Sequence, residues 1–182
     1  MPNSRTYTLA VAVFLAACLL PAAASATTYN GGVGPDDPRY AKPGKATLVN
    51  GYAVAPPDAP PEVREAIAAA NRIVGKPYKY GGGHARVEDS GYDCSGTVSY
   101  AMHHAGLLGT PLDSSGFMSW GLPGKGRWIT VYTNPGHAFV VIAGLRLDTS
   151  AAGERRNSGR GPRWRTNARV TRGFRARHPK DF

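Results

Sequence analysis

One cysteine in this sequence lies where nucleophilic catalysis is chemically plausible. Cys94 belongs to the run Asp93-Cys94-Ser95-Gly96, at the predicted start of a helix. The thiolate is the reactive form of cysteine, and unfilled backbone N–H groups at a helix N-terminus stabilise negative charge there. The same N–H groups can stabilise the oxyanion of a tetrahedral intermediate. This position favours a nucleophile over a buried cysteine that only fills space.

A cysteine nucleophile needs a base, and His137 is placed to supply one. It follows Pro135-Gly136 and opens an apolar segment, 138–142, which predicts a central strand. The histidine then lies at the end of the sheet with its ring available. Exposure to solvent is the simpler interpretation for the other histidines, namely His84, His178 and at least one of His103 and His104.

The base usually needs an orienting partner that holds its tautomer and ring plane. If Ala143-Gly144 is a two-residue turn, His137 lies opposite Ser150. Asp148 then shares the face of His137, at a diagonal position. A three-residue loop would place Thr149 there instead. A carboxylate orients an imidazolium better than a hydroxyl does, so Asp148 is the preferred third residue and Thr149 the alternative.

Two helices are predicted ahead of the strands. Pro61 opens the first, with Asp58 or Pro60 in the cap region, because the missing donor of proline is spare in the first turn. The second helix starts near Cys94 and stops near Gly106, a typical C-terminal residue. The buried face of the first helix is predicted from its helical spacing: Val63, Ile67, Ala70 and Val74.

Strand patterns dominate after the second helix. Strands are predicted at Arg127–Tyr132, His137–Ile142, Leu145–Ser150 and Gly173–Arg177. Helices first and an antiparallel sheet later is the order of an α+β fold. Ahead of the second helix, the three glycines at 81–83 would let the backbone pass close to another group.

The first residues predict an export signal. Arg5 gives a positive start, residues 9–20 are apolar, and residues 24–26 are the small residues that signal peptidase requires. Residues 1–26 are therefore predicted to be a signal peptide, and the apolar run is too short for a comfortable membrane span. The run ending in Cys18 also resembles a lipobox, in which that cysteine would be acylated and anchor the mature protein.

The rest of the chain is predicted to be a linker followed by one domain. Residues 27–61 hold seven prolines and five glycines, with an Asn-Gly turn that could form a hairpin near residues 47–54. Residues 62–182 are the predicted domain. After processing of the signal, Cys94 is the only free thiol in an oxidising compartment, where an unpaired structural cysteine brings no benefit.

The charge is concentrated at the C-terminal end. The chain has 182 residues, of which 42% are hydrophobic, enough for one domain. Its formal net charge is +10, and residues 154–182 carry nine arginines and one lysine against two acidic residues. Such a segment suits an anionic partner. For an exported chain we expect an anionic wall polymer and no nucleic acid, and a solvated basic surface is an equally good interpretation.

Three stretches of this sequence resemble the NlpC-type cell-wall peptidases, which are small papain-like enzymes. Residues 75–82 look like the family's glycine-rich approach to the nucleophile. Residues 93–96 are similar to its nucleophile signature, and Gly136-His137 with the following strand looks like its histidine strand. The resemblance runs from about 62 to 150, and less closely through 173–179.

The resemblance implies a papain-like α+β fold, with the cysteine helix packed on an antiparallel sheet and no need for a metal or organic cofactor. It also suggests that Tyr78, Asp93 and Ser95 line the substrate cleft. Two departures are visible. The family often has tryptophan where Tyr80 stands. Its third polar residue usually lies one position further from the histidine than Asp148 does, which leaves that role open.

We therefore expect a monomeric, secreted or wall-associated cysteine endopeptidase that hydrolyses peptide bonds in peptidoglycan stems, commonly the bond between γ-D-glutamate and the diamino acid. The alternative is a non-catalytic wall-binding module that uses its basic surface. An amidase or transferase built on the same cysteine and histidine is a third possibility.

Overall fold

The computed structural model of the protein describes residues 42–151, 161–166 and 168–182. The predicted signal peptide at 1–26 and the possible lipid anchor at Cys18 lie outside the described residues. In the described part of the chain, no helix is both long and apolar enough to cross a membrane.

Helices and strands occur in the mixed order that the sequence predicts. In the described residues they are β1 (Thr47–Val49), β2 (Tyr52–Val54), α1 (Pro61–Ile73), α2 (Cys94–His104), α3 (Ser114–Phe117), β3 (Leu122–Pro123), β4 (Ile129–Asn134), β5 (His137–Ile142), β6 (Leu145–Asp148), β7 (Arg163–Arg165) and β8 (Arg175–His178).

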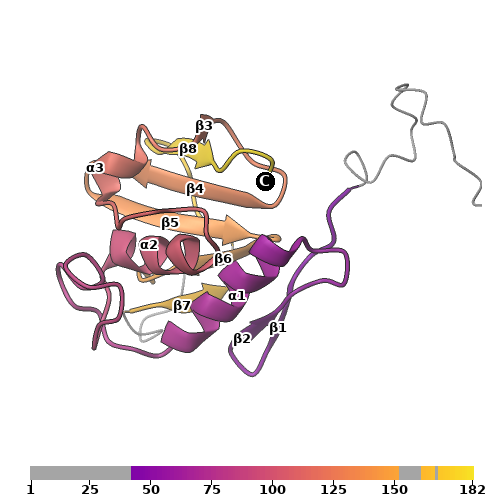
Figure 1. Cartoon of the computed structure of the whole chain (residues 1–182), viewed down its shortest axis with the longest axis horizontal. Coiled ribbons are helices and arrows are strands. Elements are labelled where there is room, and N and C mark those ends of the chain that lie inside the picture. The colour runs from indigo at the N-terminus through magenta and orange to yellow at the C-terminus, as the bar shows by residue number, and fades with distance from the viewer. Residues whose placement is uncertain (1–41, 152–160, 167) are drawn as a thin grey trace, which may run out of the picture. The chain divides into compact units, whose positions relative to one another are not determined.

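The main sheet is antiparallel and has the order β3-β8-β4-β5-β6-β7. The helices α1 and α2 cross one face of it (Figure 1). Helices packed on an antiparallel sheet confirm the predicted α+β class. The edge strands β3 and β7 and the short helix α3 were not predicted.

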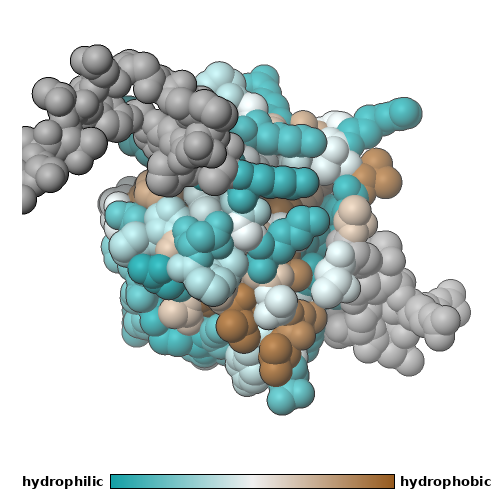
Figure 2. Space-filling view, turned by 90° about the vertical axis from the view of Figure 1, so that its right-hand side faces the viewer, coloured by the Kyte–Doolittle hydropathy of each residue, from teal (hydrophilic) through white to brown (hydrophobic). Residues whose placement is uncertain are grey.

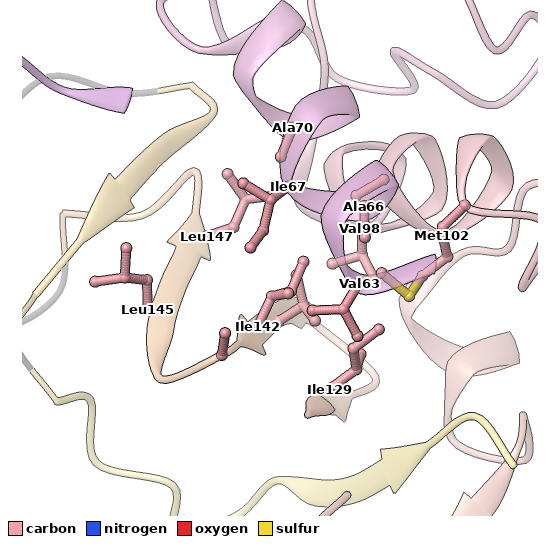
Figure 3. Close-up of a cluster of buried hydrophobic side chains, with 14 of the residues drawn as sticks. Val63, Ala66, Ile67, Ala70, Val98, Met102, Ile129, Ile142, Leu145 and Leu147 are labelled. Carbon is pink, nitrogen blue, oxygen red and sulfur yellow. The ribbon is translucent and has the colours of Figure 1, made fainter. Parts of the chain in front are cut away.

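The core fills the space between these helices and the sheet. Three of the four residues predicted for the buried face of α1 are buried, with Val63, Ile67 and Ala70 at or below 2% exposure. The fourth, Val74, is half-buried and follows Ile73, the last residue of the helix. Alternate residues of β5 point toward the same space, because successive side chains of a strand face opposite sides. Figure 3 shows the cluster. Its labelled members are Val63, Ala66, Ile67, Ala70, Val98, Met102, Ile129, Ile142, Leu145 and Leu147.

Part of the segment predicted as a linker packs on this domain. The hairpin β1–β2 belongs to the same compact unit as the sheet. The side chain of Asn71 on α1 accepts a hydrogen bond from the Ala53 N–H (3.0 Å) and donates one to the Ala53 carbonyl (2.9 Å). Trp164 on β7 donates its indole N–H to the same Asn71 oxygen (2.8 Å). One amide therefore joins the hairpin, α1 and the edge of the sheet.

The outer side of the hairpin stays in solvent. Leu48, Val49, Tyr52 and Val54 are each between 36% and 51% exposed. Figure 2 shows a face of the molecule that is mostly hydrophilic, with small hydrophobic patches between the polar groups. Apolar side chains scattered in this way are normal on a protein surface.

The turn between β5 and β6 has two residues, as the preferred register required. Ala143 and Gly144 both have positive φ, at 46° and 84°, and Ile142 pairs with Leu145. Two residues of positive φ are typical of the tight turns that match the twist of a hairpin. This register places Asp148 on the face of His137, at the predicted diagonal position, so the location of Asp148 depends on this turn.

Candidate active site

Asp93 fixes the start of α2, where Cys94 is the first helical residue. Its carboxylate accepts a hydrogen bond from the Gly96 N–H (2.7 Å), and its carbonyl accepts one from the Thr97 hydroxyl (2.7 Å). A capping aspartate satisfies N–H groups that the helix itself leaves unpaired. The thiol of Cys94 therefore sits over the N-terminus of a well-capped helix.

The glycine loop packs directly on this helix start. A β-carbon at Gly96 would overlap the carbonyl oxygen of Gly82. The Asp93 N–H also donates to that carbonyl (3.3 Å). The expectation that the loop glycines allow a close backbone approach agrees with this contact. The backbones of the loop and of the nucleophile helix are thus in direct contact, and the Asp93 carboxylate adds a further link by accepting from the Gly81 N–H (3.0 Å).

Cys94, His137 and Asp148 come together from three different elements. The thiol is hydrogen-bonded to the His137 side chain and to the backbone N–H of Ala138 on β5. The Nε2 atom of His137 lies 2.9 Å from Oδ1 of Asp148, whose side chain is fully buried. The structure therefore brings the predicted nucleophile, base and preferred orienting residue into one chain of contacts. Thr149, the alternative, is buried and has no contact of this kind with His137 among the described interactions.

These contacts shift the pKa values of the base and the nucleophile toward charged forms. Burial would lower the pKa of His137, but hydrogen bonds to Asp148 and Cys94 outweigh it and raise the pKa to about 9. Burial would raise the pKa of Cys94, but hydrogen bonds from His137 and Ala138 lower it below its usual value. A thiolate beside an imidazolium is the pairing that these two shifts favour near neutral pH.

A cleft of about 420 Å³ opens beside the thiol. It contains Tyr78, Asp93 and Ser95, the three residues that the family resemblance suggested, together with Cys94. The opposite wall comes from the Ser114 and Pro135 region, where the Ser114 hydroxyl donates to the Pro135 carbonyl (3.1 Å). The remaining lining residues are Tyr80, Gly81, His84, Asp113, Ser115 and Gly136.

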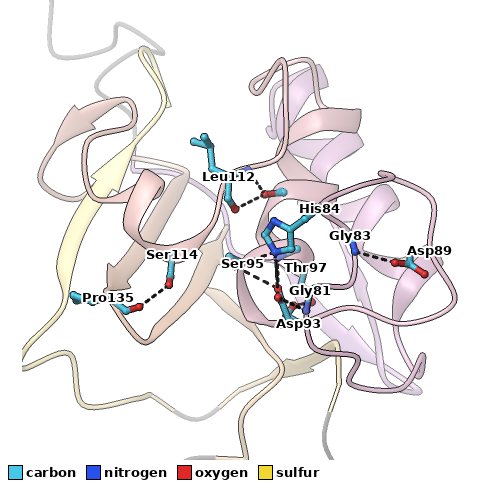
Figure 4. Close-up of polar contacts among 12 residues, drawn as sticks. Gly81, Gly83, His84, Asp89, Asp93, Ser95, Thr97, Leu112, Ser114 and Pro135 are labelled. Carbon is cyan, nitrogen blue, oxygen red and sulfur yellow. Dashed lines mark hydrogen bonds and ion pairs between the residues drawn. The ribbon is translucent and has the colours of Figure 1, made fainter.

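His84 belongs to the cleft rather than to the solvent, which corrects the sequence interpretation. Its Nε2 lies 2.9 Å from Oδ1 of Asp93 and 3.3 Å from the Ser95 hydroxyl (Figure 4). The hydrogen bond to Asp93 is the main reason why the pKa of His84 is raised. Burial would raise the pKa of Asp93, but His84 and the Gly96 N–H lower it overall. The side of the cleft next to the thiol therefore carries a hydrogen-bonded imidazole and carboxylate.

Arg169 is the other site residue that the sequence analysis did not single out. Its guanidinium donates to Oδ2 of Asp148 at 2.9 Å. The residue lies in the basic segment after β7, which showed no motif. Only the tertiary fold places this segment over the sheet face that carries Asp148, so no signal in the sequence could have found it.

Among the described residues, no group of three or more histidine, cysteine, aspartate or glutamate side chains is placed to hold a metal ion. The chemistry available is that of a thiol, an imidazole and a carboxylate. Such a set can transfer an acyl group through a covalent thioester.

Comparison with known proteins gives little further information. No family model matches the chain, and no curated protein matches it. Among solved structures, Rv1477, a hypothetical invasion protein of Mycobacterium tuberculosis, is similar to it with a TM-score of 0.46 and 19% sequence identity. The match covers 75% of this chain and 71% of that one. A similarity at this level carries no argument about function.

Proposed function

We propose that the protein is an exported, papain-like cysteine endopeptidase that hydrolyses peptide bonds in peptidoglycan stem peptides. The observation that carries the proposal is the contact chain from the Cys94 thiol through His137 to the buried carboxylate of Asp148. The resemblance of residues 75–82, 93–96 and 136–142 to NlpC-type peptidases supports the substrate class and suggests the bond that follows γ-D-glutamate.

The proposed reaction has two steps. His137 takes the proton of Cys94, and the thiolate attacks the carbonyl carbon of the scissile bond. N–H groups at the start of α2 stabilise the oxyanion. As the C–N bond breaks, His137 returns the proton to the leaving amine, and a thioester remains on Cys94. Water, deprotonated by His137, then hydrolyses the thioester and frees the thiol.

Asp148 acts in both steps through the histidine. Its Oδ1 accepts from Nε2 of His137, which leaves Nδ1 as the ring nitrogen for the thiol. A carboxylate in this position fixes the tautomer and stabilises the imidazolium when it forms. Tyr78, Asp93, Ser95 and His84 line the cleft in which the stem peptide would bind.

The test is digestion of purified peptidoglycan by the mature protein and by its Cys94→Ala variant. We expect the wild type to release peptides and the variant to release none, with both binding equally to the wall. Undiminished release by Cys94→Ala would end the proposal. Mass analysis of the products separates the reactions, because an amidase would free the glycan from the first alanine and an endopeptidase would cut within the stem.

We also propose that the basic C-terminal segment associates with anionic wall polymers. Arg172, Arg175 and Lys180 are exposed and carry no ion pair among the described contacts. Replacing these three by glutamine should reduce pelleting with cell walls at low salt, because exposed charges act over distances that salt screens. Unchanged pelleting would contradict the proposed association with wall polymers. Pelleting without any released peptide would favour the non-catalytic wall-binding module.

A further inference from the structure

Arg169 lies next to both Asp148 and His137 and contacts the second oxygen of the Asp148 carboxylate. It comes from the segment between β7 and β8, outside the stretches that resemble the peptidase family. Nη1 of Arg169 is 2.9 Å from Oδ2 of Asp148 and 3.5 Å from Nε2 of His137. The guanidinium therefore touches the orienting carboxylate directly and the base only at the limit of hydrogen bonding.

The two oxygens of Asp148 have different partners. Oδ1 accepts from Nε2 of His137 (2.9 Å) and from the Ser150 N–H (2.8 Å). Oδ2 accepts from Arg169, and Nε of Arg146 lies 3.6 Å away from it. Because Arg169 occupies Oδ2, Oδ1 is the oxygen that is left to accept from the imidazole.

The guanidinium of Arg169 is itself held in place by two aromatic rings. Its central carbon lies 5.3 Å from the ring centre of Phe139 and 5.3 Å from that of Phe174. The rings meet edge to face, with centres 5.3 Å apart. A planar cation against two ring faces gains cation–π energy, and only 16% of its side chain is exposed. Arg169 is thus a fixed donor rather than a mobile surface charge.

We propose that Arg169 is a positioning residue for the Cys94–His137 pair, acting through the carboxylate of Asp148. This inference rests on the proposed cysteine chemistry and adds a member to it. Arg169 holds Oδ2, and Oδ1 is thereby aligned on the imidazolium. Replacement by methionine keeps a similar aliphatic bulk against the rings but removes the donor.

The charged groups around the base determine what the replacement should do. His137 faces Cys94 from α2, Asp148 from β6, and Arg169 from the segment after β7. Without Arg169, the nearest cation to Oδ2 is Arg146 on β6. Removing Arg169 takes away a cation 3.5 Å from Nε2, which alone would favour the imidazolium, but it also takes away the donor that orients the Asp148 carboxylate. We expect the second effect to dominate, because the Asp148 hydrogen bond is the main contact that raises the pKa of His137. The imidazolium then has a poorer acceptor and gives up its proton more readily.

The experiment compares Arg169→Met with Arg86→Met, a matched control at an exposed arginine that does not line the cleft. The first readout is the rate at which iodoacetamide alkylates Cys94 between pH 5 and 10. The second is the NMR titration of the His137 ring, assigned with His137→Gln. In Arg169→Met we expect the His137 midpoint to fall by roughly one pH unit and alkylation at pH 6 to slow about fivefold. Arg86→Met should match the wild type.

Turnover gives a third readout. With a peptidoglycan stem peptide, Arg169→Met should lower kcat about tenfold and leave KM within about twofold, since the change misaligns the base without touching the cleft. Arg169→Lys, which retains the charge and the stem, should recover part of the loss. Thermal unfolding of each variant shows whether it is folded, and if Arg169→Met is not, Arg169→Gln, which is shorter and uncharged, carries the same comparison.

An unchanged His137 midpoint and unchanged alkylation in Arg169→Met would overturn the inference. A rise in the midpoint with normal kcat would also overturn it, because it would mean that Arg169 only repels the imidazolium. Neither readout on Cys94 or His137 needs a peptide substrate. A wild-type thiol with an ordinary pKa and no hydrolysis would instead remove the proposed function itself.

Discussion

Asp148 has no exposed side-chain surface, so its charge must be balanced by the groups around it. Burial raises the pKa of this carboxyl, but hydrogen bonds from His137 and the Ser150 N–H, with the charges of His137 and Arg169, lower it overall. A buried aspartate held ionised beside an imidazole is more than a structural group, because its removal changes the charge that the base can carry.

Replacing this carboxylate by an amide tests its role. Asp148→Asn keeps the shape, but the amide can present an N–H to His137 and favour the wrong tautomer. We expect kcat for stem-peptide hydrolysis to fall on the order of ten-thousandfold, as in a catalytic triad whose orienting carboxylate is changed to an amide. Thr149→Val is the control, and we expect a change of less than about threefold. Steady-state kinetics on both variants decides the matter, and the reverse ranking would assign the role to Thr149.

At this scale, the sequence was sufficient for Cys94 and His137 because each follows a local signal. Cys94 follows a capping aspartate, and His137 opens an apolar strand after a turn. Asp148 needed one further assumption, the length of the turn before it. His84 and Arg169 could not be predicted as site residues. Both lie in loops, and only the tertiary packing of those loops brings them to Asp93 and Asp148.

The nucleophile helix depends on one position where no side chain fits. Adding a methyl group at Gly96 would place it on the backbone carbonyl of Gly82, which cannot rotate away as a side chain can. Alanine is the better helix former by about 1 kcal/mol, so propensity alone predicts stabilisation. We expect the opposite, a loss of about 2 kcal/mol of unfolding free energy from steric overlap.

Urea denaturation measures this difference, with Gly109→Ala as the control. No atom lies within 4 Å of a β-carbon at Gly109. Its replacement should change the unfolding free energy by less than about 0.5 kcal/mol, as for an ordinary surface site. A Gly96→Ala protein as stable as the wild type would show that the glycine loop does not constrain the start of α2.

A single amide joins the hairpin to the domain. Asn71→Ala would leave the Ala53 N–H and carbonyl and the Trp164 indole without their Asn71 partner. Losing these hydrogen bonds should lower the unfolding free energy by about 1–3 kcal/mol in total. The loss is not larger because the groups are only partly buried and some of them can bind water instead. We expect this loss in thermal or urea unfolding. Glu65→Ala, on the same helix in an exposed ion pair, should cost less than about 0.5 kcal/mol.

The elements differ in how well periodicity could find them. β5 has the predicted limits because a run of five apolar residues after a turn is a strong signal. α1 begins at the predicted Pro61. Its N-cap position is Pro60, one of the two residues that were predicted for the cap region. β7 was not predicted because Arg163-Trp164-Arg165 has charged residues on both sides of one aromatic residue, a pattern typical of exposed loops. In the fold, Trp164 and Arg165 are buried at the sheet edge.

For the whole molecule, the basic C-terminal segment has two different uses. Arg177 donates to the backbone carbonyls of Ser119, Trp120 and Gly121, and Arg169 holds Asp148. These arginines serve the fold and the site. Net charge alone could not separate them from the exposed arginines, because composition does not say which guanidinium groups find carbonyl or carboxylate partners.

The distribution of buried acids also determines how the whole molecule responds to acid. Asp93 and Asp148 both have a pKa below the ordinary value in the folded state. The unfolded chain therefore binds more protons than the folded one below about pH 4, the usual range of aspartate. Their contribution to stability is present above that pH and is lost as pH falls through the folded pKa values. His84 and His137 are protonated in both the folded and the unfolded state in this pH range, so they do not change the direction in which stability varies with pH.

We therefore expect the unfolding free energy to fall between about pH 5 and pH 2, by up to about 1.4 kcal/mol per pH unit for each aspartate that takes up a proton. The melting temperature should fall with it. Asp148→Asn should be less stable than the wild type at pH 6 but should lose less on acidification, because one of the aspartates whose pKa is lowered in the folded state is gone. Calorimetry at a series of pH values measures both slopes. Parallel curves for the two proteins would mean that Asp148 is not held ionised by His137 and Arg169.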